Sequence, residues 1–248
     1  MVQYNPLQYL PSAEELPDSD DTPVDNELQI LVPALLRAIL AQVWIERWDW
    51  FLGVNMGVYY EPKESAIVPD GFLSLGVQRF KGSKLRLSYV LWQEDNIVPQ
   101  LALEVVSRTP GDEYGDKMAK YAQIGVLYYV IYNPDYYRRD KHDSFEVYRL
   151  VNGVYIRQSG QPIWMLELGL GIGCEQGNHE GYNREWLYWY NQQGDRLPAP
   201  ANVIEQERQR AEQAEQRLEQ VEQQLEQERR LREELLNRLR DRGIDVDG

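Results

Sequence analysis

The spacing of hydrophobic residues predicts a helix near the start of this chain. Between residues 27 and 45, apolar side chains recur at intervals of three and four, the period of one helix face. These positions are Ile30, Ala34, Leu35, Ala38 and Ile39. Asp25 and Asn26 are suited to cap the first turn, and Pro33 is tolerated near a helix start. We therefore expect an amphipathic helix here.

After this helix the pattern changes to that of β-strands. Residues 54–62 and 66–75 predict two strands that pair through the polar segment 61–65. Residues 79–96 begin as a basic loop and become extended. The helical period therefore gives way to a run of extended segments.

The clearest unit is a strand, a helix and a second strand. Residues 101–107 are too few for a helix and too apolar for a surface strand, which predicts a central position in a sheet. A helix is expected over residues 112–124, and Gly125 is a normal helix stop. Residues 126–132 predict the next buried strand. A crossover of this length implies that the two strands are parallel, with a right-handed connection.

Shorter signals predict more strands toward the C-terminal side. Asn152-Gly153 lies between two alternating segments, which is a strong hairpin signal. Residues 164–173 and 185–190 are rich in glycine and aromatic residues and predict further strands.

Composition divides the chain into three parts. Residues 1–26, rich in Pro, Asp, Glu and Ser, predict an extended or poorly ordered lead, and residues 27–200 predict one folded domain. Residues 201–248 predict a coiled-coil-like helix with a short tail. Seven of nine positions at alternating spacings of three and four are apolar in the set Ala211, Ala214, Leu218, Val221, Leu225, Glu228, Arg232, Leu235 and Leu239.

This C-terminal pattern has two interpretations. Small alanines and two charged seam positions weaken it as a zipper, so a solvated single helix held by ion pairs four residues apart stays possible. We favour self-association through this helix, giving a homo-oligomer, most simply a dimer.

The charge balance argues against a broad nucleic-acid-binding surface. The chain has 26 Lys and Arg against 40 Asp and Glu, a formal net charge of −14, whereas affinity for phosphate backbones comes largely from cationic side chains. Acidic sites nevertheless recruit cations, and basic loops can act locally. The single cysteine, Cys174, excludes an internal disulfide and fits a reducing compartment. Without a secretory signal or an apolar run long enough to cross a bilayer, a soluble cytoplasmic protein is expected.

Two carboxylates are the strongest candidates for chemistry. Asp70 follows Pro69 at the end of an extended segment, and Glu104 lies within the predicted central strand. Two converging carboxylates repel each other unless a cation lies between them, and their oxygen atoms suit Mg²⁺ or Mn²⁺. A glutamate at a strand end can also simply reach solvent or an arginine. The apolar neighbours of Glu104 make a purely structural role costly, so metal ligation is favoured.

Lys117, on the predicted helix, is the third candidate. It could orient or deprotonate a water molecule, or stabilise charge on a phosphate. The alternative is an exposed ion pair with Glu113, four residues earlier. Tyr121 continues the same helix face and could cover the site or belong to the core. Glu27 could supply a third carboxylate, although little in the sequence distinguishes it from other acids.

Other residues give weaker signals. His142 and His179 have no partners at metal-ligand spacing, which argues against zinc. The glycines of residues 169–173 lack the strand–helix setting of a phosphate loop. Two basic patches could contact phosphates or be ordinary solvated loops; they are Arg79, Lys81, Lys84 and Arg86, and Arg138, Arg139 and Lys141.

Three segments of the chain resemble the Uma-type family of restriction endonucleases. They are IVPDGFLSLGV, LEVVSRTPGDEYGDKMAKYAQIGVLYYVIYNP and REWLYWY. This family is a branch of the PD-(D/E)xK nuclease superfamily expanded in cyanobacteria, and the resemblance covers about residues 25–195. It implies an α/β (α+β) domain with a restriction-endonuclease-like mixed β-sheet flanked by helices.

The resemblance also implies roles for individual residues. Asp70 corresponds to the PD aspartate and Glu104 to the (D/E) residue. Val106 stands where the superfamily has its lysine, so the lysine of this chain is expected on the following helix, at Lys117. Glu27 corresponds, more loosely, to an auxiliary acidic metal ligand.

Two functions from different classes follow. The first is a Mg²⁺-dependent endonuclease that hydrolyses nucleic acid, with DNA preferred, although the residues do not separate DNA from RNA or nucleotides. The second is a catalytically inactive nuclease scaffold that oligomerises and binds another protein. A sequence-reading surface, which a restriction enzyme needs, is not evident.

Overall fold

The computed structural model describes residues 10–17, 25–82, 85–109 and 111–241. The chain forms two units, residues 1–197 and residues 198–248. Most of the predicted lead, and Lys84 of the first basic patch, lie outside the described residues.

A six-stranded mixed sheet is the centre of the first unit. Its order is β1-β3-β5-β6-β7-β8, and β5 pairs in parallel with β6 while the other neighbours are antiparallel. The bounds are β1 Trp50–Val54, β3 Gly71–Leu75, β5 Leu101–Val105, β6 Tyr128–Tyr132, β7 Phe145–Val151 and β8 Val154–Arg157. Both β5 and β6 are buried along their whole length, which confirms the predicted central strands and their parallel pairing.

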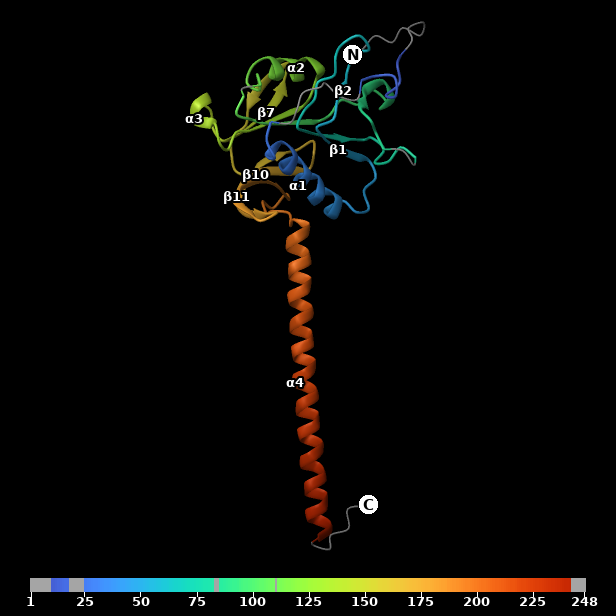
Figure 1. Ribbon diagram of the computed structural model, residues 1–248, viewed down its shortest axis with the longest axis vertical. Helices are drawn as coiled ribbons and strands as arrows, with labels where there is room; N and C mark the ends of the chain where they lie inside the picture. Colours follow the sequence, from blue (N-terminus) through green and yellow to red (C-terminus); the bar gives the residue numbers. More distant parts are fainter. Residues whose placement is uncertain (1–9, 18–24, 83–84, 110, 242–248) are drawn as a thin grey trace. The chain divides into compact units, whose positions relative to one another are not determined.

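Layers on both faces cover this sheet, as Figure 1 shows. Helix α2 (Asp116–Ile124) lies on one face, and α1 (Leu28–Val43) lies on the other together with a three-stranded sheet. That sheet has the order β11-β10-β9, with β9 Ile163–Met165, β10 Leu170–His179 and β11 Tyr182–Tyr190. The buried indole of Trp189 on β11 donates a hydrogen bond to the Leu36 carbonyl of α1, at 2.9 Å. The predicted mixed sheet flanked by helices is thus confirmed.

Both predicted helices of this unit form, with differences in detail. In α1, Leu35 and Ile39 are buried as predicted, whereas Ile30 is exposed. The remaining buried residues of the helix are Leu28, Val32, Pro33, Leu36 and Leu40. The Asn26 side chain accepts hydrogen bonds from the first backbone N–H groups of the helix, at 2.9 and 3.3 Å. Helix α2 ends at Gly125 as expected, but begins at Asp116 rather than residue 112, because a turn with Asp112 at positive φ precedes it.

Two predicted strand arrangements were wrong. The predicted hairpin through residues 61–65 is reduced to an isolated bridge between Val58 and Ile67. Instead, β3 pairs with β1 and β5, and β2 (Val58–Tyr59) pairs with the distant β4 (Tyr89–Val90) in a separate sheet. The predicted strand 164–173 is split by a turn in which Gly169 takes positive φ. The Asn152-Gly153 hairpin is confirmed, with both residues at positive φ.

Short elements complete the unit. A single 3₁₀ turn, η1 (Leu91–Gln93), follows β4, and a four-residue helix, α3 (Tyr137–Asp140), follows β6. The described part of the lead contacts the domain: the Trp92 indole donates to the Pro11 carbonyl and the Tyr59 hydroxyl donates to the Pro17 carbonyl.

The second unit contains one long helix, α4 (Pro200–Asp241). Ion pairs four residues apart, such as Arg208–Glu212 and Arg230–Glu226, lie along its surface. Leu218, Val221, Leu225 and Leu235 are all largely exposed. In the part of the chain that the structure describes, no helix has the length and apolar character needed to cross a membrane.

Candidate active site

Asp70 and Glu104 come together where β3 and β5 pair. Asp70 directly precedes β3, and the register of the pair places Gly71 opposite Leu103, one residue before Glu104. The backbone N–H of Val105 donates a hydrogen bond to Asp70 Oδ2, at 2.7 Å. Both carboxyl side chains are buried, Asp70 at 6 % exposure and Glu104 at 1 %. Sheet pairing, a long-range contact, therefore positions the first two predicted residues side by side.

Helix α2 supplies the groups that contact Glu104. Lys117 Nζ lies 2.9 Å from Glu104 Oε2, and the Tyr121 hydroxyl donates to Glu104 Oε1 at 2.5 Å. The two donors are four residues apart and therefore share one helix face. The crossover brings this face back over β5, so that both oxygens of the buried Glu104 carboxylate accept a hydrogen bond. A helical ion pair between Lys117 and Glu113 does not form among the described residues, because Glu113 precedes α2.

Burial and mutual repulsion dominate the electrostatics of the two carboxyl groups. Burial raises the pKa of Asp70 to about 8, and the Glu104 carboxylate contributes to the rise. Burial also raises the pKa of Glu104, against the opposing effects of Lys117 and of the hydrogen bond from Tyr121. Burial acts to lower the pKa of Lys117, but the Glu104 carboxylate, with Asp70, raises it above its ordinary value. Lys117 is consequently a cation at neutral pH.

Glu113 is a further acid beside this group, and no role in the site was predicted for it. Its side chain is 5 % exposed although it lies in a loop, and its negative charge raises the pKa of both Asp70 and Glu104. Glu113 Oε2 accepts a hydrogen bond from the Gly111 N–H at 3.1 Å. A Cβ at Gly111 would lie 2.6 Å from Glu113 Oε1, so any other residue there would require this carboxylate to shift. In the sequence, Glu113 is distinguished only by its position between the predicted central strand and the helix that follows it.

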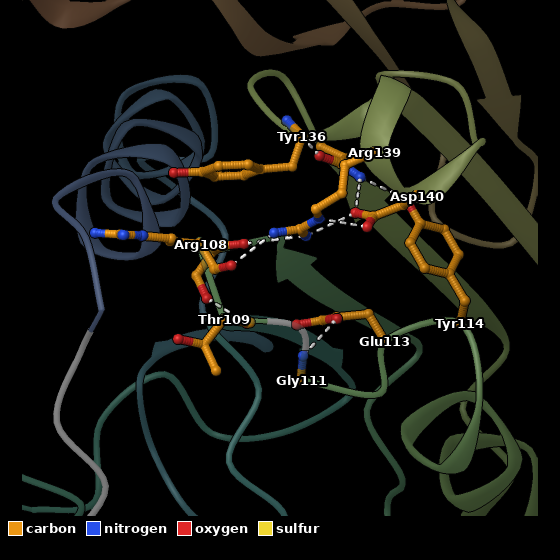
Figure 2. Close-up of polar contacts among 10 residues, drawn as sticks. Arg108, Thr109, Gly111, Glu113, Tyr114, Tyr136, Arg139 and Asp140 are labelled. Atoms are coloured by element: carbon orange, nitrogen blue, oxygen red, sulfur yellow. Dashed lines mark hydrogen bonds and ion pairs between the residues drawn. The ribbon is translucent and has the colours of Figure 1, made fainter.

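Figure 2 shows how the loop after β5 is held against α3. The Arg139 guanidinium donates to the Arg108 carbonyl at 2.6 Å and to the Ser107 carbonyl at 3.4 Å. It also pairs with Asp140 and lies over the Tyr136 ring, 4.6 Å from its centroid. We call this set of contacts the Arg139 clasp. It connects the two loops that leave the parallel strands β5 and β6.

Glu27 is not part of this group of contacts. It lies at the start of α1 and accepts a hydrogen bond from the Tyr182 hydroxyl at 3.1 Å. The two histidines also lie in other contacts: His142 stacks on Tyr114, 3.6 Å between ring centroids, and His179 meets Trp186 edge-on. Cys174 is buried, and burial raises the pKa of its thiol. Among the described residues, no group of three acids, histidines or cysteines is arranged to hold a metal ion.

Asp70 and Glu104 nevertheless form a donor set that suits a hard divalent cation. Mg²⁺ is commonly held by one or two carboxylates and retains several water molecules. Asp70 Oδ1 accepts no hydrogen bond from the described residues, whereas Oδ2 is held by Val105. The raised pKa values of the two acids show that their ionised forms are undercompensated by the protein alone. A divalent cation would relieve this repulsion.

The Uma2 family, described as "Putative restriction endonuclease", matches residues 6–176. None of the curated proteins matches the sequence. Among solved structures, the chain is similar to a putative nuclease of DUF820 from Anabaena variabilis, with 11% identity and a TM-score of 0.41, covering 58% of this chain and 73% of that chain. Because the family match spans more than half of the sequence, the chain belongs to the Uma2 family of putative restriction endonucleases.

Proposed function

We propose that this protein is a metal-dependent endonuclease that hydrolyses DNA. The observation that carries the proposal is the buried Glu104 carboxylate, which lies beside Asp70 and is bound by Lys117 and Tyr121. Membership of a family of putative restriction endonucleases supports nuclease chemistry. In this proposal Asp70 and Glu104 hold Mg²⁺ or Mn²⁺.

Each side chain has a distinct part in the proposed reaction. A bound divalent cation would polarise the scissile phosphate and acidify a water molecule. Lys117, whose pKa is raised, keeps its proton at neutral pH, so it acts by stabilising negative charge on a phosphate oxygen or by orienting water rather than as a base. Tyr121 holds Glu104 Oε1 and thereby sets the direction in which the carboxylate points. Val105 fixes Asp70 in the same way through its backbone N–H.

The test is cleavage by the purified full-length protein of labelled double-stranded DNA, single-stranded DNA and RNA. We expect cleavage of DNA with Mg²⁺ or Mn²⁺ and none with EDTA, because the two carboxylates need a cation to act together. Cleavage of RNA alone would overturn the choice of polymer. A rate in EDTA equal to that in Mg²⁺ would contradict the metal dependence.

A second proposal concerns α4: we infer that it self-associates, most simply as a dimer. Its exposed Leu218, Val221 and Leu225 recur at spacings of three and four, which is the seam pattern of a coiled coil. The ion pairs along α4 would support a single solvated helix equally well. The exposed aliphatic side chains favour association because solvating them is unfavourable.

Substitution of the seam in the full-length chain tests this inference. Leu218→Asn with Leu225→Asn should convert an oligomer to a species near the monomer mass of 29.1 kDa, because the apolar seam is lost. The measurement is light scattering after size exclusion. Gln216→Asn with Gln223→Asn is the matched control, with the same seven-residue spacing on another face. A wild-type protein that already has the monomer mass would contradict self-association.

A further inference from the structure

Exposed cations gather on the two loops that leave the sheet beside Glu104. Arg108 follows β5, and Arg138 and Lys141 follow β6; all three side chains are exposed. Because β5 and β6 are parallel, both loops leave the sheet at the same edge. Glu104, one residue from the end of β5, lies at that edge. The three cations therefore lie on loops at the same end of the sheet as the candidate active site.

The Arg139 clasp explains how these loops keep a defined relation to each other. Arg139 uses its guanidinium on the Ser107 and Arg108 carbonyls and on Asp140. It is therefore a positioning residue and has little capacity left for a ligand. The Arg108 side chain takes no part in the clasp: in Figure 2 it extends away from Tyr114, in the same direction as the Tyr136 side chain.

Three acids of the loop after β6 are held in ion pairs, whereas the three cations are not. Asp140 pairs with Arg139, Asp135 with Arg184, and Asp143 with Arg157. Within the described ranges, Arg108, Arg138 and Lys141 form no ion pair with an acid; Arg138 contacts only the Tyr137 hydroxyl and ring. Two exposed acids of the β5–α2 segment, Asp112 and Asp116, likewise form no ion pair with any residue that the structure describes. Among the exposed and unpaired side chains described on these loops, the three cations thus outnumber the two acids, and the third unpaired acid, Glu113, is buried.

We propose that Arg108, Arg138 and Lys141 form a phosphate-binding rim that holds the backbone of a DNA substrate on either side of the phosphate to be cleaved. The inference rests on the proposed nuclease function and identifies the surface that engages its substrate. A phosphodiester chain fits because it presents regularly spaced negative charges that several separate cations can bind together. A local rim also explains how a chain with a net charge of −14 can hold a polyanion. The Arg139 clasp presents the rim but does not bind phosphate.

The test measures binding without cleavage, so that it does not depend on catalysis. The full-length protein is titrated in EDTA into a short labelled DNA duplex, and fluorescence anisotropy gives the affinity at several salt concentrations. Arg108→Ala, Arg138→Ala and Lys141→Ala are combined in one variant. Arg217→Ala, Arg229→Ala and Arg230→Ala on α4 are the matched control, with the same change of net charge at positions outside the proposed seam. Thermal unfolding of each variant checks that the fold is kept.

We expect the rim variant to bind DNA at least about tenfold more weakly than the wild type. The plot of log K against log salt should also become less steep by about three, since each phosphate that the protein no longer neutralises removes about 0.9 from the magnitude of the slope. The control variant should change neither the affinity for DNA nor the salt dependence by a comparable amount. An equal weakening in both variants would overturn the inference, because net charge alone would then explain the binding. Absence of any binding by the wild-type protein would also overturn it. Cleavage in Mg²⁺ is measured separately. If the protein binds DNA through the rim but does not cleave it, the proposed function is refuted while the inference of a phosphate-binding rim is retained.

Discussion

Replacing Glu104 by glutamine is expected to lower Mg²⁺-dependent DNA cleavage by about a hundredfold or more. Glutamine keeps the size of the side chain but loses the negative charge that a cation and Lys117 both require. Loss of groups that only orient a metal ligand already costs about 10–100-fold, so loss of a ligand should cost at least as much. Asp70→Asn should have a similar effect, because its amide oxygen can still accept the Val105 N–H but carries no charge. Initial cleavage rates on labelled DNA measure both.

A buried carboxylate elsewhere in the domain provides the control. Glu94 is 5 % exposed and pairs with Arg86 and Lys81. No hydrogen bond or ion pair among the described residues joins it to Asp70, Glu104 or Lys117. Glu94→Gln therefore removes a buried, paired charge without touching the candidate site, and its cleavage rate should stay close to that of the wild type. If Glu104→Gln and Glu94→Gln lost activity equally, the loss would reflect the fold and the assignment of Glu104 would fail.

In the metal-free protein, the free energy of unfolding should fall as the pH rises. The pKa of Asp70 is about 8 in the folded chain and about 4 in an unfolded one. The folded state therefore retains a proton that the unfolded state releases, and folding loses stability as pH rises from about 4 to about 8. Within that window this carboxyl alone contributes a slope of up to about 1.4 kcal/mol per pH unit. Glu104, whose pKa is also raised, acts in the same direction.

Asp70→Asn isolates this contribution, because asparagine is neutral at every pH in the window. In EDTA, the variant should unfold at a temperature at least about 4 °C above the wild type at pH 8, and the difference should shrink toward pH 5.5. Addition of Mg²⁺ at pH 8 should raise the unfolding temperature of the wild type far more than that of the variant. Differential scanning fluorimetry at fixed ionic strength measures the unfolding temperatures at pH 8, at pH 5.5 and at pH 8 with Mg²⁺. A difference that stays constant between pH 5.5 and pH 8 would show that Asp70 does not titrate in this range.

Local patterns in the sequence were sufficient for the centre of the domain. Continuous apolar residues identified β5 and β6 as buried strands, and the helical segment between them required parallel pairing. The Asn152-Gly153 turn likewise determined its hairpin, because few other residue pairs adopt two successive positive φ angles. These features depend on neighbouring residues alone. The sequence also placed Asp70 at the end of an extended segment and Glu104 within the central strand before any contact was known.

Only the tertiary structure decided which of these residues meet. β3 pairs with β1 and β5 rather than with the adjacent extended segment, because strand pairing depends on packing among distant segments that no local pattern contains. Helical spacing suggested Glu113 as the partner of Lys117, but a turn before α2 separates them and the crossover delivers Lys117 to Glu104. The Arg139 clasp joins residues about thirty positions apart. The sequence by itself thus determined the elements and the candidate residues, whereas sheet register and the path of the crossover determined their contacts.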